Sequence, residues 1–232
     1  MKRVVLNYLV LVAISVSPAF MSCKNEKVQL LETVTYSSGN YVKYEYNNED
    51  RITKISHYDK EKNLTFSQTF TYSGNDLVKV DFVDSTIEFS KSENKIIVNH
   101  DNVETTTIDL NEDGLPTKYE AISDGVSAVG VFEIQGGNLT KHSYKHTRDG
   151  EILEGSSNYQ YDNKKSPLYN CKTPQWWWII SEGRSVHNNV TAMFHSNGEK
   201  TEYRYEFNHA GYPIKCTAKN NENKYESKFK YK

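Results

Sequence analysis

The histidines are the side chains in this sequence best suited to ligate a metal ion or to transfer a proton. Seven are present, and the closest pair is His142 and His146. On a helix this spacing would place both rings on one face, where they could hold one ion. The local sequence instead reads as a strand or loop, and in a strand two such residues lie about 13 Å apart. We therefore predict no metal site at this pair.

Acidic pairs are the next candidates, because two carboxylates that face each other across a cleft can hydrolyse glycosides. The segment DGEILEG, from Asp149 to Gly155, holds three acidic residues close together. Acidic residues nevertheless occur along the whole chain, in the pattern of solvated strand faces. Sequence signatures of metalloproteases, serine hydrolases, phosphate-binding loops and CxxC redox sites are absent from it. The sequence thus indicates no catalytic residue, no metal and no cofactor.

The tryptophans form the most unusual stretch, because all three stand together in PQWWWII, from Pro174 to Ile180. In an extended strand, Trp176 and Trp178 would face one side and Trp177 the other. Exposed indoles stack on sugar rings and on other flat apolar ligands, whereas buried indoles would fill the core or close the end of a sheet. We therefore take these three residues, with the nearby Tyr169, as ligand-binding candidates, and burial in the core as the alternative.

Three cysteines are present, and two of them, Cys171 and Cys216, lie in the second half of the chain. In an oxidising compartment such a pair predicts one disulfide. It would close a loop of about 45 residues and stabilise the fold by roughly 3–4 kcal/mol in the chain-entropy model. Two separate buried thiols are the alternative. Neither cysteine stands in a sequence typical of a catalytic nucleophile.

The first 22 residues have the features of a secretory signal peptide. Lys2 and Arg3 precede a mostly apolar stretch that runs to Phe20. The tetrapeptide FMSC, which ends at Cys23, resembles the lipobox of bacterial lipoproteins, in which a cysteine directly follows the cleavage site. Residues 1–22 are thus predicted to be removed, and residues 23–30 to form a lipidated cysteine and a tether. Secretion without lipidation is the alternative.

Acylation at Cys23 would anchor the protein firmly, since each buried CH₂ adds about 0.8 kcal/mol of membrane affinity. The sequence therefore predicts a membrane partner through this lipid and a place in the bacterial cell envelope. We expect an outer-membrane lipoprotein that faces either the periplasm or the cell surface. The formal net charge of −2, with both signs mixed along the chain, argues against a nucleic-acid partner.

One short hairpin pattern returns along the chain. The segments YEYNNEDRITKI from Tyr44, IDLNEDGLPTKY from Ile108 and YEFNHAGYPIKC from Tyr205 each place a polar turn between two alternating runs. Alternation with period two is typical of strands with one buried face, and glycine and asparagine favour tight turns. A single hairpin cannot bury its apolar face, so the copies must pair side by side. The sequence predicts an all-β fold, an antiparallel meander of repeated hairpins curled into an open barrel or a two-layer sheet.

Residues 31–232 are expected to form a single β domain, because no linker or change of composition divides them. No amphipathic helix is apparent in this part of the sequence. Pro116 and Pro213 each follow a turn, where a missing N–H donor fits the first residue of a strand. Gly136 and Gly137 are expected in a hairpin turn. Strand breaks are expected near Asn47, Ser73, Ser90, Asn111, Gln135, Asp162 and Asn208.

The repeated turns, such as NEDGLPTK and NHAGYPIK, resemble the YD-like hairpin repeats of Rhs-type proteins. With the signal sequence and the segment YDNKKSPLYN, from Tyr161 to Asn170, most of residues 30–232 resembles the DUF4595-type lipoproteins of Bacteroidetes. That family has no known function, so the resemblance implies an envelope β-protein and no catalytic residues.

Three functional hypotheses follow. The first is a non-enzymatic envelope lipoprotein that binds a glycan, a lipid or a protein partner on the aromatic surface around the tryptophans. The second is a structural or assembly role, in which a sheet face or edge meets another protein. The third is a glycan-active hydrolase, which would need two carboxylates converging in a cleft.

Overall fold

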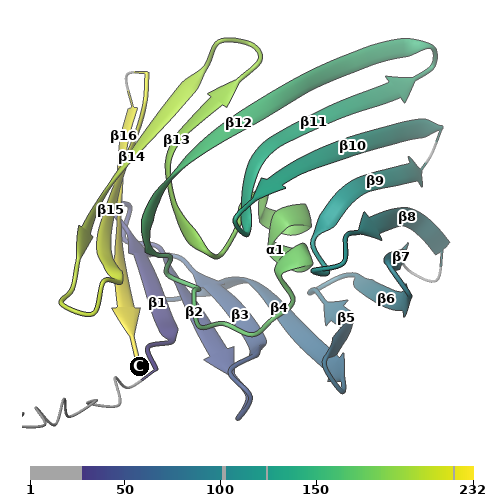
Figure 1. The fold of residues 1–232 in the computed structure, drawn as a ribbon. Coiled ribbons are helices and arrows are strands. Elements are labelled where there is room, and N and C mark those ends of the chain that lie inside the picture. The colour runs from purple at the N-terminus through teal and green to yellow at the C-terminus, as the bar shows by residue number, and fades with distance from the viewer. Residues whose placement is uncertain (1–27, 101–102, 124, 222) are drawn as a thin grey trace, which may run out of the picture.

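The computed structural model describes residues 28–100, 103–123, 125–221 and 223–232, so the predicted signal peptide and the predicted lipidation site at Cys23 lie outside the described residues. The described part forms sixteen antiparallel strands and one helix (Figure 1). No helix in these ranges is long and apolar enough to cross a membrane. The strands are β1 (Leu31–Tyr36), β2 (Tyr41–Tyr46), β3 (Ile52–Tyr58), β4 (Leu64–Ser73), β5 (Asp76–Asp81), β6 (Thr86–Ser92), β7 (Lys95–His100), β8 (Val103–Leu110), β9 (Pro116–Ser123), β10 (Val126–Gln135), β11 (Asn138–Arg148), β12 (Glu151–Lys165), β13 (Asn188–His195), β14 (Lys200–Phe207), β15 (Pro213–Asn220) and β16 (Asn223–Tyr231).

The strands pair in sequence order and close into a barrel. Closure depends on β1, in which Val34 pairs with Val42 of β2 on one side and with Phe229 of β16 on the other. The predicted all-β antiparallel meander is confirmed, and the barrel is closed. Closure leaves no unpaired edge among the described strands, which removes the usual site for edge-to-edge association.

Alternation along each strand separates the inside of the barrel from its outer wall, by which we mean the outward-facing side chains of the sixteen strands. On β2, Tyr44 and Tyr46 pack against the core, whereas Lys43 and Glu45 are exposed. Tyrosine suits the inner positions because its ring fills space while its hydroxyl tolerates water or a polar partner. The tyrosines of the chain thus include partly buried rings that pack against the core.

The recurring hairpin has one backbone geometry, which occurs in six turns among the described residues. In each, the first residue donates its N–H to the carbonyl of the fifth, and the fourth donates to the carbonyl of the first. The fourth residue has positive φ, which glycine adopts without strain and Asp50 and Lys62 also adopt here. This is the turn with a bulge that favours the right-handed twist of hairpins. The six turns span residues 36–40, 47–51, 59–63, 111–115, 195–199 and 208–212.

A side-chain oxygen at the first turn position completes four of these turns. The Oδ1 atom of Asn47 accepts the N–H of Arg51 at 3.0 Å, and Asp59, Asn111 and Asn208 make the same bond to the fifth residue of their turns. The two prolines predicted to begin strands do so in β9 and β15, directly after such turns. Gly136 and Gly137 form the two-residue turn between β10 and β11, as predicted. Strands β6 and β12 run past the breaks expected near Ser90 and Asp162.

The helix α1 (Gln175–Glu182) corrects the expectation that residues 31–232 contain no amphipathic helix, and it shows that PQWWWII does not adopt the extended conformation considered above. It lies inside the barrel (Figure 1). A sixteen-stranded barrel is too wide for inward side chains alone to fill. A segment that enters this space must satisfy its own backbone hydrogen bonds, and a helix does so. The helix starts after Pro174 and ends at Gly183, whose φ of 61° is left-handed.

The segment from Ser166 to Pro174, which we call the crossing segment, carries the chain from β12 into the barrel and is held at its far end by Thr173. The backbone N–H of Ile52 donates to Thr173 Oγ1 at 2.9 Å, and the Tyr72 hydroxyl lies 2.9 Å from the same oxygen. Both bonds are made by strands far away in sequence. The segment is therefore anchored to the barrel wall in addition to its own local turns, in which Tyr169 N–H donates to the carbonyl of Ser166 and Cys171 N–H to that of Leu168.

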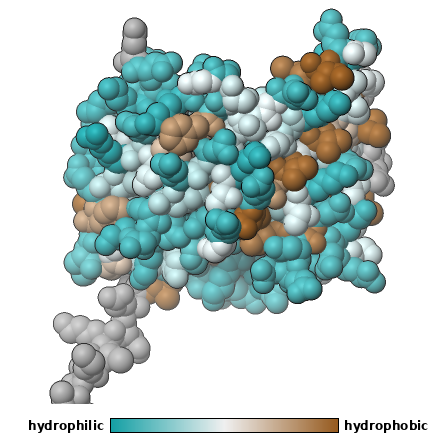
Figure 2. Space-filling model, turned by 45° about the horizontal axis from the view of Figure 1, so that its top comes forward, coloured by the Kyte–Doolittle hydropathy of each residue, from teal (hydrophilic) through white to brown (hydrophobic). Residues whose placement is uncertain are grey.

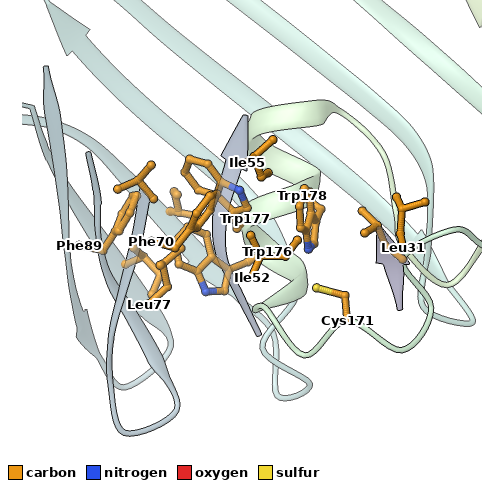
Figure 3. Packing of buried hydrophobic residues seen from close by; sticks show 14 of the residues in the cluster. Leu31, Ile52, Ile55, Phe70, Leu77, Phe89, Cys171, Trp176, Trp177 and Trp178 are labelled. Carbon is orange, nitrogen blue, oxygen red and sulfur yellow. The ribbon is translucent and has the colours of Figure 1, made fainter. Parts of the chain in front are cut away.

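The tryptophans form the centre of the hydrophobic core (Figure 3). Trp176 and Trp177 pack edge-to-face on Phe89, with ring centroids 5.1 and 5.7 Å apart, and Trp177 also meets Phe70 at 5.6 Å. These partners come from β4 and β6, so the helix packs against the β3–β9 side of the barrel. A second buried group continues the core toward β11 and contains Leu115, Phe132, Leu139 and Ile179.

Candidate functional site

The predicted ligand-binding tryptophans are buried. The exposed fractions of Trp176, Trp177 and Trp178 are 6%, 6% and 1%, which agrees with the alternative of a core role and corrects the interpretation of an exposed aromatic surface. Tyr169 is 41% exposed and lies on the crossing segment, where its ring meets His187 with centroids 5.5 Å apart. The structure thus separates Tyr169 from the indoles with which it was grouped.

The predicted disulfide is also corrected, because Cys171 and Cys216 are free and buried thiols in the structure. Cys171 lies on the crossing segment beside Thr173 and Ile52, whereas Cys216 lies on β15 beside Tyr205. The two thiols therefore belong to different surroundings. His142 and His146 lie on the single strand β11, in the extended conformation that separates their rings along the strand.

A cavity of about 340 Å³ lies inside the barrel, and we call it the lumenal cavity. Its walls come from β1, β2 and β12–β16, from the start of the crossing segment and from the residues that follow α1. This is the part of the interior that the tryptophans leave unfilled. The residues that line it are Leu31, Val34, Tyr36, Tyr44, Tyr159, Ser166, Pro167, Leu168, Glu182, Gly183, Arg184, Ser185, Val186, Asn188, Asn189, Val190, Met193, Tyr203, Tyr205, Cys216, Ala218, Ser227 and Phe229.

The end of α1 delivers two charged side chains to the lumenal cavity. Gly183 caps the helix by donating its N–H to the carbonyl of Ile179 at 3.1 Å, and its left-handed backbone turns the chain back into the interior. Glu182 and Arg184 flank this glycine, with Arg184 Nη2 3.5 Å from Glu182 Oε2. Their side chains are 42% and 52% exposed although both line an interior cavity. Both groups are thus accessible to a molecule inside the barrel.

Arg184 keeps its positive charge in this position. Partial desolvation inside the barrel lowers its pKa, but the Glu182 carboxylate and the surrounding tyrosines more than offset this, so that the pKa is raised. Among the described residues that line the lumenal cavity, Arg184 is the only cation and Glu182 the only acid. The interior therefore holds one fixed positive charge with one loosely placed counter-charge.

Tyrosines surround this charge and remain neutral. Burial raises the pKa of Tyr44 and of Tyr205, and the Arg184 guanidinium opposes both rises. The Tyr205 hydroxyl donates to the carbonyl of Val190 at 3.0 Å, which fixes its ring at the cavity wall. The walls thus offer aromatic faces and hydroxyls without adding further charge at neutral pH.

The chemistry of the lumenal cavity favours binding over covalent catalysis. The one thiol that lines it, Cys216, has a pKa raised to about 11 by burial, against which the Tyr205 hydrogen bond and the Arg184 charge act. A thiol in that state is a poor nucleophile near neutral pH. A mostly apolar cavity with a few polar groups is the usual form of a small-molecule site, and its volume lies near the lower end of the range of about 300–1,000 Å³.

Glu182, Arg184 and the cavity tyrosines were not singled out from the sequence. A signal for the first two exists, since glycine shortly after an apolar run marks the end of a helix, and Gly183 follows WWWII after Ser181 and Glu182. No comparable signal connects them to Tyr36, Tyr44 or Tyr205, which lie on strands distant in sequence.

No family model matches the chain, and no curated protein matches it. Among solved structures, the chain is similar to a crystal structure described as a porin-like protein from Bacteroides uniformis ATCC 8492. The identity is 12% and the TM-score 0.40, and the match covers 87% of this chain and 98% of that chain. The fold described above therefore stands on the strand pairings of this chain, and the resemblance to DUF4595-type lipoproteins stays a prediction.

Proposed function

We propose that this protein is a non-enzymatic binding protein of the bacterial envelope that holds a small ligand inside its barrel. The observation that carries the proposal is the Arg184 side chain, which is about half exposed and lines a cavity of about 340 Å³ in the interior of the molecule. A protein that needed only stability would gain by filling this space with apolar side chains. A charged, accessible group among neutral tyrosines instead fits a site that receives a ligand.

The charged side chains of the outer wall support the proposal that the barrel is surrounded by water. The wall carries ion pairs between neighbouring side chains, such as Lys79–Asp81 at 2.9 Å and Lys141–Glu133 at 3.0 Å. A lysine on a lipid-facing barrel wall costs about 2–4 kcal/mol at the bilayer midplane. Figure 2 shows that the surface in view is mostly hydrophilic. We therefore propose that the lipid at Cys23, rather than the strands, attaches the protein to the outer membrane.

An assembly role is the second candidate, and a group of exposed apolar side chains favours it. Ile122 of β9, Val131 of β10 and Ile152 of β12 are 72%, 47% and 58% exposed. Figure 2 shows hydrophobic residues gathered on one side of the molecule among hydrophilic ones. Such groupings often mark contacts between proteins. The closed barrel offers no free sheet edge among its described strands, so this face is where an assembly contact would form.

The binding proposal is tested by filling the lumenal cavity. Ala218 lines it from β15, and Ala218→Phe would place a ring where the ligand is expected. Thr217→Phe is the matched control, because the adjacent residue of a strand points to the opposite face. The purified chain is screened by thermal shift against glycans, fatty acids and aromatic acids.

A ligand present at 100 times its dissociation constant should add about 2.7 kcal/mol to the unfolding free energy. For a domain of this size that raises the midpoint of thermal unfolding by roughly 5–10 °C. We expect Ala218→Phe to abolish this shift and Thr217→Phe to keep it. A screen with no stabilising compound, or one whose hits survive Ala218→Phe unchanged, would reject the cavity as a ligand site.

A further inference from the structure

The guanidinium of Arg184 has hydrogen-bonding capacity that the protein leaves unused. It carries five N–H donors. Within the described chain its only ion pair is the one with Glu182, whose 3.5 Å separation exceeds the 2.7–2.9 Å of a charge-assisted hydrogen bond. A planar guanidinium with free donors matches the two oxygens of a carboxylate. The inside of the barrel thus presents an anchor suited to one acidic group.

The wall around this anchor is mainly apolar. Leu31, Val34, Val190, Met193 and Phe229 line the cavity from β1, β13 and β16, together with the rings of the tyrosines. Burying a hydrocarbon against such a surface is favourable by roughly 25 cal/mol per Å². The wall therefore complements the body of a ligand that is itself largely apolar.

The number of charges limits the charge of the ligand. A phosphate monoester carries nearly two negative charges at neutral pH, and no second cation lines the described cavity. For a ligand to bind Arg184, the Glu182 carboxylate must also move away from the guanidinium. Because both side chains are about half exposed and their contact is long, the pair is worth no more than about 1 kcal/mol and can separate.

We infer that the ligand is an amphiphilic monoacid, whose carboxylate pairs with Arg184 and whose apolar body lies along the cavity wall between the tyrosines and the aliphatic residues. This inference rests on the proposed function and names the chemical class of its ligand. Glu182 then acts against binding, since it competes with the ligand carboxylate for Arg184 and repels it.

The test compares decanoate with 1-decanol, which has the same chain length and no charge, by isothermal titration calorimetry on the purified full chain at pH 7.5. We expect decanoate to bind at least 10-fold more tightly than decanol. Arg184→Met should remove that advantage and leave decanol unchanged. Arg204→Met is the matched control, because Arg204 is exposed on β14 and does not line the cavity, so affinities should stay as in the unchanged protein.

Glu182→Gln gives the sharpest outcome, since its effect changes sign with the class of ligand. A monoacid should bind more tightly once the competing carboxylate is gone. Weaker binding of decanoate in Glu182→Gln, or equal binding of decanol and decanoate to the unchanged protein, would overturn the inference. If only this inference fails, compounds of other classes will still stabilise the protein in the thermal-shift screen, and Ala218→Phe will abolish their effect. If the proposed function itself fails, no compound will behave in this way.

Discussion

At the scale of single residues, two glycines inside strands allow aromatic rings to lie across the sheet. A Cβ atom at Gly130 of β10 would lie 1.9 Å from Cε1 of Tyr119, its pairing partner on β9. At Gly155 of β12 a Cβ would lie 2.6 Å from the Tyr144 hydroxyl oxygen. Neither glycine has positive φ, so close approach rather than backbone freedom explains them.

Gly130→Ala should therefore destabilise the barrel by about 1–3 kcal/mol, because the Tyr119 ring must leave its position. The effect should nearly vanish in a Tyr119→Ala background, where no ring stands in the way. Urea unfolding of both single variants and of the double variant measures this coupling. An equal loss of stability in both backgrounds would show that the alanine is disfavoured for another reason.

The two thiols provide the second prediction at this scale, best made in a Cys23→Ser chain, where only they remain. Burial raises the pKa of Cys216 to about 11, and burial also raises that of Cys171. An exposed thiol titrates near 8.5. At pH 8 we expect Cys216 to react with Ellman's reagent about 100-fold more slowly in the folded chain than in guanidinium chloride.

The sign of the associated pH effect follows from the same values. Above about pH 8.5 the unfolded thiol loses its proton while the folded one keeps it, so the free energy of unfolding should fall as pH rises toward 11. Two reactive thiols in denaturant without reductant would agree with free cysteines. None would mean that Cys171 and Cys216 pair after all.

At the scale of elements, α1 divides the interior into a filled part and an open part. Its tryptophans pack on β4 and β6, and its end carries Glu182 and Arg184 into the lumenal cavity. The stability of the core thus depends on the tryptophans of α1, whereas ligand binding depends on the residues at its C-terminal end. Because an isolated helix of eight residues is not stable in water, α1 exists only through these contacts with the barrel.

Trp178→Ala should cost about 3–5 kcal/mol, the loss typical of a large buried aromatic residue. Trp178→Phe should cost much less, since the indole N–H is buried without a hydrogen-bond partner among the described residues and its removal leaves nothing unpaired. Tyr225→Ala, at a 57% exposed position, is the surface control and should cost under about 1 kcal/mol. Similar losses in all three variants, measured by urea unfolding, would contradict a core role for Trp178.

At the scale of the whole molecule, the charges of the outer wall and the lipid proposed at Cys23 should act separately. Cys23→Ser would remove the proposed lipid and leave the charged wall unchanged. We expect this variant to leave the membrane fraction and to purify without detergent, while the unchanged protein is membrane-bound and takes up labelled fatty acid. Retention of the variant in membranes after a carbonate wash would mean that the barrel itself inserts.

Local features of this protein were predictable from its sequence because their causes are local. The alternation of Tyr44, Glu45 and Tyr46 places successive side chains on opposite faces of a strand wherever that strand lies. The turns at Asn47, Asn111 and Asn208 are closed by bonds between residues at most four positions apart. Strand class, antiparallel order and the two strand-initial prolines all follow from such short-range rules.

The interior was decided only by the tertiary structure. Three adjacent tryptophans are compatible with a strand or a helix, and closure of the barrel around a space too wide for side chains favours the helix. The candidate site joins Arg184 to Tyr36 and Tyr205, and the distance in sequence between these residues conceals their proximity in the barrel. The sequence by itself therefore determined the strands and turns of the barrel wall, because these depend on residues close together in the chain. The helix and the cavity inside the barrel depend on contacts between distant residues, which form only when the barrel closes.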